Sequence, residues 1–111
     1  MSDDLEIMSF PTVDALWSWL EEHHQTHSGV WVRLQKSTST VPSVSFHEVL
    51  EAGIAFGWSE STRRGESSMT FLQKFTPRRA RGTTSDRNNR IADCLERTGR
   101  LTSAGRRALG R

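Results

Sequence analysis

The sequence predicts a single α+β domain, in which about four helices pack with a small antiparallel or mixed sheet of about three strands. Apolar residues recur every three or four positions in residues 12–26, 45–56 and 85–98, as they do along one face of a helix. They alternate with polar residues in residues 29–36 and 58–75, as they do in half-buried strands. Helices and strands that follow one another in this uneven order are typical of the α+β class.

The first predicted helix begins at Thr12, which can serve as its N-cap, and fades near residues 26–29. Its apolar face is formed by Val13, Leu16, Trp17 and Leu20. The strand that follows, residues 29–36, has its valines on one face and polar or bulky residues on the other. We therefore expect the valine face to be buried against the helices.

The second predicted helix begins with a capping box and ends before a glycine. Ser45 and Glu48 have the spacing of the capping box at its start, and Gly57 suits the left-handed residue that follows its end. Two strands then form a hairpin that turns near Gly65, and Pro77 ends the second of them.

The third predicted helix, residues 85–98, carries the only cysteine of the chain, Cys94. Its inward-facing residues are Ile91, Ala92 and Leu95. A single cysteine excludes an internal disulfide, and we expect Cys94 to be a buried thiol because it lies within this apolar run. Thr102 can cap a short last helix that ends near Leu109.

Charge is divided unevenly along the 111 residues. Residues 1–60 carry two basic and nine acidic side chains, a net −7, whereas residues 61–111 carry thirteen basic and four acidic ones, a net +9. This asymmetry favours an acidic partner, or else the two halves neutralise each other by packing together. A chain of this length fits one domain, residues 10–111, after an N-terminal tail of residues 1–9.

The composition argues against several classes of protein. No apolar run approaches the roughly 18 residues of a membrane span, and residues 1–8 lack a secretory charge pattern, so we expect a cytoplasmic protein. His23 and His27 have a spacing that can bind a metal on a helix, but no cluster of further ligands accompanies them. Neither a metal nor a cofactor is predicted.

Five blocks of residues give the sequence a resemblance to a known family. In order they are Trp19 to His24 with Gly29 to Val32, Phe56 to Glu60, Phe75 to Arg79, Asn88, and Gly99 to Gly105. Together they resemble the signature of the YdeI/OmpD-associated family, also called bacteriocin-protection proteins, over about residues 10–110. The resemblance implies the fold of that family and a bacterial setting of envelope stress or of protection against bacteriocins. It implies no assigned reaction.

Two of these blocks depart from the family pattern. Residues 57–61 read Gly-Trp-Ser-Glu-Ser where the family usually reads Gly-Trp-Ile-Asp-Gly, so the acid is kept but is longer by one methylene. Residues 80–85 read Ala-Arg-Gly-Thr-Thr-Ser where the family usually reads Pro-Gly-Ser-Asn-Trp-Ser. Thr83 and Thr84 thus stand in place of an asparagine and a tryptophan, and any family activity that needs those side chains is in question.

The open end of the predicted hairpin combines an aromatic ring, an acid and a basic loop that leads into the third helix. Arginine recognises phosphate and carboxylate groups, and a helix start favours an anion. The predicted anion-binding residues are Trp58, Glu60, Arg78, Arg79, Arg81, Ser85 and Asn88. Arg63 and Arg64 are expected about 20 Å away at the turn, because each strand residue rises by about 3.3 Å.

Several interpretations of this surface stay open at the level of sequence. Glu60 can instead pair with Arg78 or Arg79 to pin the loop, and Trp58 can belong to the core. As a functional surface it suits a non-enzymatic protein that binds an anionic small molecule or an acidic protein. The twelve arginines and one lysine after residue 60 suit nucleic acid as an alternative partner. An enzyme with Glu60 as general base and an arginine as oxyanion stabiliser is the third possibility.

Overall fold

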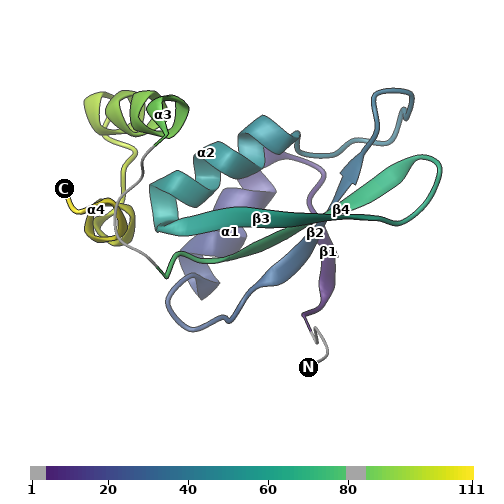
Figure 1. The fold of residues 1–111 in the computed structure, drawn as a ribbon, viewed down its shortest axis with the longest axis horizontal. Helices are drawn as coiled ribbons and strands as arrows, with labels where there is room; N and C mark the ends of the chain where they lie inside the picture. Colours follow the sequence, from purple (N-terminus) through teal and green to yellow (C-terminus); the bar gives the residue numbers. More distant parts are fainter. Residues whose placement is uncertain (1–4, 80–84) are drawn as a thin grey trace.

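Within residues 5–79 and 85–111, which the computed structural model describes, four helices pack with a four-stranded mixed sheet (Figure 1). The predicted α+β class is therefore confirmed. The elements in chain order are β1 (Ile7–Ser9), α1 (Val13–His23), β2 (Val30–Gln35), α2 (Phe46–Phe56), β3 (Trp58–Gly65), β4 (Thr70–Pro77), α3 (Asp86–Arg97) and α4 (Ser103–Leu109).

The sheet has the strand order β1-β2-β4-β3, and it contains one strand more than the sequence predicts. The additional strand is β1, which runs parallel to β2 and pairs Ile7 with Trp31. It lies within the residues predicted as a tail, and its three residues are too few to show an alternating pattern. β4 runs antiparallel to both β2 and β3, so the predicted hairpin is confirmed.

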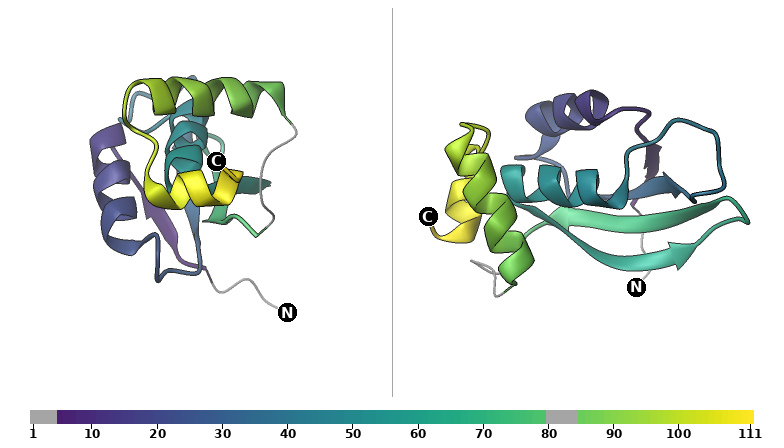
Figure 2. Two further views of the ribbon diagram at one scale, coloured as in Figure 1. Left: turned by 90° about the vertical axis from the view of Figure 1, so that its left-hand side faces the viewer. Right: turned by 90° about the horizontal axis from the view of Figure 1, so that it is seen from above.

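The hydrophobic core lies between the sheet and helices α1 and α2. Val30 and Val32 of β2 are buried in it, as the alternation predicted, together with Phe75 of β4. Leu16 and Leu20 are the fully buried residues that α1 contributes. Helices α3 and α4 pack at one end of this layer, where both contact α2 (Figure 2).

The predicted helix caps are present. The Thr12 side chain accepts a hydrogen bond from the backbone N–H of Ala15 at 3.1 Å. Ser45 and Glu48 form both halves of the capping box, which satisfies two backbone N–H groups at the start of α2. Gly57 follows α2 in the left-handed conformation, with φ 80° and ψ 27°, so the chain leaves the helix directly into β3.

The prediction that Cys94 is buried is wrong, because its side chain is exposed. The buried positions of α3 are Asn88, Ala92 and Leu95. Cys94 follows Ala92 by two residues, which is about 200° around a helix with 3.6 residues per turn. It therefore faces away from α2 although it stands within an apolar run.

A β-bulge interrupts the β3–β4 pairing between Glu60 and Arg63. Between these paired positions β3 has two residues, Ser61 and Thr62, where β4 has only Lys74, so one β3 residue has no opposite partner. The side chain of Gln73 is only 2% exposed, and its Nε2 donates to the backbone oxygen of Thr62 at 3.2 Å. This buried amide therefore supports the strand where the regular ladder is broken.

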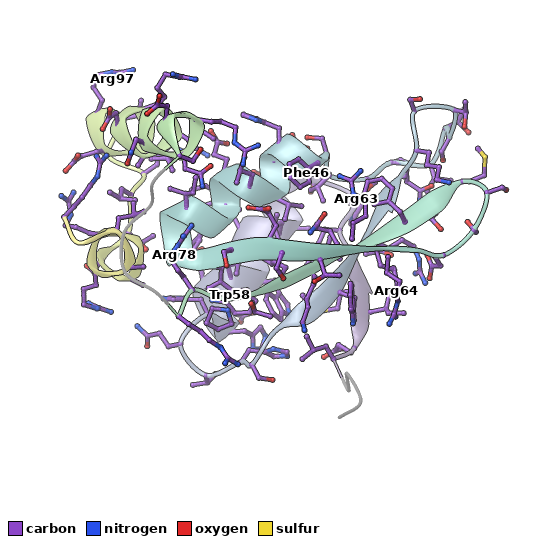
Figure 3. All side chains as sticks on the ribbon, in the orientation of Figure 1. Phe46, Trp58, Arg63, Arg64, Arg78 and Arg97 are labelled. Carbon is purple, nitrogen blue, oxygen red and sulfur yellow. The ribbon has the colours of Figure 1, made fainter. Side chains whose placement is uncertain are left out.

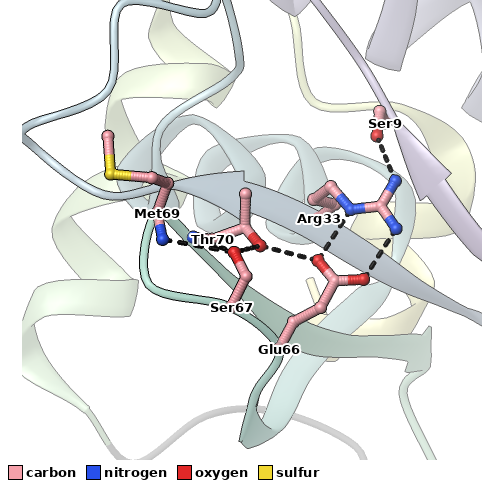
Figure 4. Close-up of polar contacts among 6 residues, drawn as sticks. All are labelled: Ser9, Arg33, Glu66, Ser67, Met69 and Thr70. Atoms are coloured by element: carbon pink, nitrogen blue, oxygen red, sulfur yellow. Dashed lines mark hydrogen bonds and ion pairs between the residues drawn. The ribbon is translucent and has the colours of Figure 1, made fainter.

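A polar network joins β1, β2 and the hairpin turn (Figure 4). Arg33 donates from Nε and Nη2 to the two carboxylate oxygens of Glu66, at 2.7 and 2.6 Å. Its Nη1 donates to Ser9 at 3.2 Å, and the Thr70 hydroxyl donates to Glu66 at 2.8 Å. The hydrogen bonds from Arg33, with that from Thr70, lower the pKa of Glu66 from 4.5 to about 2.

This lowered pKa predicts a stability term that is lost in acid. The term is fully present above pH 4.5, where the unfolded carboxylate is already ionised, and it disappears as the pH falls to about 2. The pair is partly exposed, so we expect Glu66→Gln to lower the free energy of unfolding by about 1 kcal/mol at pH 6 and by almost nothing at pH 2. Urea unfolding at several pH values measures this difference. Glu22→Gln, which makes the same change at an exposed position of α1, is the matched control.

Candidate functional site

The junction of α2 and β3 organises the end of the molecule that carries α3 and α4. A Cβ atom on Gly57 would lie 2.9 Å from the backbone oxygen of Ala104, in addition to the strain of its positive φ. The backbone N–H of Arg78 donates to the Gly57 oxygen at 2.9 Å. Gly57 therefore touches α4 on one side and the end of β4 on the other.

Trp58 is a core residue. Its side chain is 1% exposed, and its ring lies 5.0 Å from the ring of Phe75 and 5.7 Å from that of Trp19. The indole Nε1 donates to the backbone oxygen of His24 at 3.2 Å. The predicted aromatic platform is thus covered by α1 and β4, and the contribution of Trp58 is to hold the start of β3 in place.

The pairing of Trp58 with Pro77 places Arg78 and Arg79 at the end of the sheet where β3 begins. Arg78 is half-buried and Arg79 is exposed. Glu60, half-buried, lies two residues into β3. Its carboxylate forms no hydrogen bond or ion pair with the residues that the structure describes, so the pinning of the loop by Glu60 is not observed among them.

Arg63 and Arg64 lie at the other end of the hairpin, as predicted (Figure 3). They pair with Gln73 and Leu72 and occupy opposite faces of the sheet. The guanidinium of Arg63 lies 4.3 Å from the ring centre of Phe71, and that of Arg64 lies 4.4 Å from the ring centre of Trp31. These contacts assign the Arg63–Arg64 pair to the far turn.

The start of α3 contains two of the predicted anion-binding residues. The Ser85 side chain caps the helix by accepting from the Asn88 N–H at 3.3 Å. Asn88 is 8% exposed, and its side-chain oxygen accepts from Arg87 Nε at 3.2 Å. Asn88 is therefore oriented inward. The predicted contact of Arg81 and the substituted positions Thr83 and Thr84 lie outside the described residues.

A cavity of about 300 Å³ opens between the ends of α1 and α2 and the start of α4. Its lining residues are Glu21, His24, Gln25, Phe56, Thr102, Ser103 and Ala104. The sequence analysis missed this site because its walls come from segments about 80 residues apart. Phe56 and residues 102–104 fall in two of the blocks that carry the family resemblance. This overlap was the one signal in the sequence that these segments could form a site together.

Gly105 allows α4 to form the wall of this cavity. A Cβ atom on Gly105 would collide with the backbone oxygen of Ala55 and would lie 2.6 Å from that of Ile54. The Thr102 hydroxyl donates to the Ala55 oxygen at 2.6 Å, and the Thr102 N–H donates to the same oxygen at 3.1 Å. The last turn of α2 and the first turn of α4 thus touch through their backbones.

Three histidines, His23, His24 and His27, gather near the end of α1, and His24 lines the cavity. The ring of Trp19 lies 5.1 Å from that of His23 and 4.9 Å from that of His27. Nδ1 of His27 accepts from the N–H of Gly29 at 3.1 Å. Among the described residues, no three His, Cys, Asp or Glu side chains are grouped so that they could hold a metal ion.

Within the described residues the protein is a small α+β domain with a cavity between α1, α2 and α4, and with Arg78 and Arg79 at the end of the sheet where β3 begins. The chain belongs to a family described as a domain of unknown function, DUF8412, which it matches over residues 8–108. Neither a curated protein nor a solved structure matches it. No helix in residues 5–79 or 85–111 is long and apolar enough to cross a membrane.

Proposed function

We propose that the protein is a non-enzymatic, cytoplasmic binding protein of the stress or protection type, and that it binds an anionic small molecule. The ligand lies where β3 begins, β4 ends and α3 begins. The resemblance to the YdeI/OmpD-associated family motivates the biological setting, whereas DUF8412 itself assigns none. The chemistry of the site rests on the residues alone.

The observation that carries the proposal is the position of Arg78 and Arg79. The Trp58–Pro77 pair and the bond from the Arg78 N–H to Gly57 hold the backbone of Arg78 against the rigid start of β3. A guanidinium on an ordered strand end loses less freedom on binding an anion than one on a free loop. The twelve-residue helix α3 begins at Asp86, eight residues after Arg78 along the chain, and the first N–H groups of a helix favour negative charge.

Arginines in and after α4 pair with acids of α3. Arg106 contacts Glu96 at 2.6 Å, and Arg111 contacts Asp93 and Glu96 at 2.8 Å each. Both partners of each pair lie in residues 61–111, so this pairing leaves the net +9 of that half unchanged and does not join the two halves. It reduces the number of cations that a ligand could use near α4.

Nucleic-acid binding is the weaker candidate. A duplex or single strand binds through cations that follow one continuous surface. Arg63 and Arg64 occupy opposite faces of the sheet, at the far end of the hairpin from Arg78 (Figure 3). The basic side chains therefore do not form a single track through β3 and β4.

Catalysis by Glu60 has less support than binding. A general base must lie within hydrogen-bond reach of the proton that it abstracts, and in most enzymes a neighbouring side chain orients it. His24 forms a hydrogen bond with Leu20, and His27 contacts Gly29 and Glu6. Among the described residues no histidine forms a hydrogen bond or ion pair with Glu60. Glu60 is better suited to accept a hydrogen bond from a ligand hydroxyl or amine.

The double substitution Arg78→Ala/Arg79→Ala tests the proposed site. Titrations with inorganic phosphate and with adenosine triphosphate, followed by amide chemical shifts, should perturb Glu60, Arg79 and Ser85 in the native protein. We expect the double variant to bind the responding anion at least about tenfold more weakly, because two charge-assisted hydrogen bonds are lost. Its urea unfolding midpoint should stay close to that of the native protein.

Arg63→Ala/Arg64→Ala is the matched control, since it removes the same charge from the opposite end of the hairpin. Equal weakening in both variants would mean that only net charge matters and would refute the site. A short single-stranded oligonucleotide that binds more tightly than the small anions, with a steep fall in affinity at higher salt, would favour the nucleic-acid alternative.

A further inference from the structure

We propose that the cavity between α1, α2 and α4 is a second binding site, and that it takes a small organic cation, a primary ammonium group on an apolar body. Its lining combines hydrogen-bond acceptors at the rim with an aromatic wall. The proposed anion site uses the two arginines that follow β4, so the two sites bind opposite charges and can be tested separately.

The polar side of the cavity is formed by one helix. Glu21 and His24 lie on the same side of α1, three residues apart, and both line the cavity. Nδ1 of His24 lies 2.6 Å from the backbone oxygen of Leu20. A carbonyl oxygen can only accept, so Nδ1 carries the proton and the neutral ring presents Nε2 as an acceptor.

The acceptors match an ammonium group. The Glu21 carboxylate is exposed and forms no ion pair with the described residues, so a bound cation would not have to displace a partner. An ammonium group has three donors and no acceptor, and it pairs with a carboxylate and an imidazole nitrogen at once. A carboxylate ligand would face the negative charge of Glu21 instead.

The aromatic wall of the cavity is Phe56, and outside the cavity its neighbour Trp17 binds a cation. The ring of Phe56 lies 5.1 Å from that of His24 and 5.1 Å from that of Trp17. On Trp17 the guanidinium of Arg100 lies 4.6 Å from the ring centre. Aromatic faces attract cations through their quadrupole, so the same row of rings favours a positively charged ligand in the cavity.

The cavity volume limits the ligand to a small molecule. A volume of about 300 Å³ stands at the lower end of the range of small-molecule sites. Phe56 is 4% exposed and is held by its neighbours, so the wall does not have to reorganise to accept an apolar group. A phenyl or short alkyl group against Phe56, with its ammonium towards Glu21, satisfies both halves of the lining.

The test compares three probes of similar shape: phenethylammonium, phenethyl alcohol and phenylpropionate. In titrations followed by amide chemical shifts, phenethylammonium should perturb Glu21, His24 and Ser103 in a saturable way. The neutral alcohol should bind at least about tenfold more weakly because it lacks the charge-assisted hydrogen bond. Phenylpropionate should not bind there. Equal or tighter binding of phenylpropionate at these residues, or no binding of the ammonium at millimolar concentration, would overturn the proposal.

Two neighbouring carboxylates supply the matched variants. Glu21→Gln should weaken phenethylammonium at least about tenfold, whereas Glu22→Gln, with the same change in charge on the next residue of α1, should leave its affinity unchanged. Equal effects of the two would mean a diffuse attraction and no site. The Arg78→Ala/Arg79→Ala variant should bind phenethylammonium with native affinity, and Glu21→Gln should bind anions with native affinity. The two proposals can therefore be refuted separately.

Discussion

Gly105→Ala is expected to destabilise the protein by about 2–3 kcal/mol, the usual cost of forcing an extra group into a packed interior. In most helix interiors the same substitution stabilises a protein, since alanine is favoured over glycine there by about 1 kcal/mol. The loss of stability expected for Gly105→Ala is therefore opposite to the usual effect. Here the added Cβ would meet the backbone oxygens of Ala55 and Ile54, and backbone atoms cannot rotate away as a side chain can. α4 would have to move away from the end of α2.

Urea unfolding of the variant measures this cost. Gly65→Ala is the matched control, since no atom lies within 4 Å of the Cβ that it would add. We expect its free energy of unfolding to change by no more than about 0.5 kcal/mol. The amide signals of Thr102 and Ser103 should shift in folded Gly105→Ala, because the wall of the cavity moves. A Gly105→Ala protein as stable as the native one would contradict the close α2–α4 contact.

Trp58→Ala is expected to lower the free energy of unfolding by about 3–5 kcal/mol, which is the range for removing a large aromatic side chain from a core. The ring is almost fully buried and packs against Trp19 and Phe75, so its loss leaves a cavity that α1 and β4 can only partly close. A domain of ordinary stability has about 5–15 kcal/mol in all, so much of this protein could be unfolded after the substitution. Thermal and urea unfolding would measure the change.

Trp58→Phe separates the structural role of this residue from a role in binding. The phenyl ring keeps much of the packing but loses the hydrogen bond from Nε1 to the His24 oxygen, for which we expect a cost of about 1 kcal/mol beyond the smaller ring. Anion affinity of the folded variant should be unchanged, because the indole faces the core. A stable Trp58→Phe protein with at least tenfold weaker anion binding would show that the ring contacts the ligand.

Local signals in the sequence predicted most of the secondary structure. Thr12, Ser45 with Glu48, and Gly57 mark helix ends because their side chains, or the lack of one, satisfy backbone groups within three or four residues. The alternation in residues 29–36 predicted the buried valine face of β2 but not the burial of Trp31 on the opposite face, and Gly65 predicted the neighbourhood of the hairpin turn. The separation of Arg63–Arg64 from Arg78–Arg79 followed from the hairpin alone.

Contacts between distant segments were the ones that sequence reasoning missed. β1 is a strand only because β2 provides its partner, and three residues carry no pattern of their own. Cys94 stands in an apolar run, but the direction of α2 decides which side of α3 is buried. The cavity requires the end of α1 to meet the start of α4, and no local pattern reports that approach.

Residues 56–58 show which features local sequence determines and which depend on tertiary contacts. They are Phe56, Gly57 and Trp58. Their identities determine that a helix ends and a strand begins there, since only the glycine adopts a left-handed turn without strain. The direction of each ring depends on its neighbours: Trp58 is covered by α1 and β4, whereas Phe56 lines the cavity beside α4. Turn chemistry acts over a few residues and can be predicted from the chain, but burial depends on which distant surfaces meet when the whole domain packs.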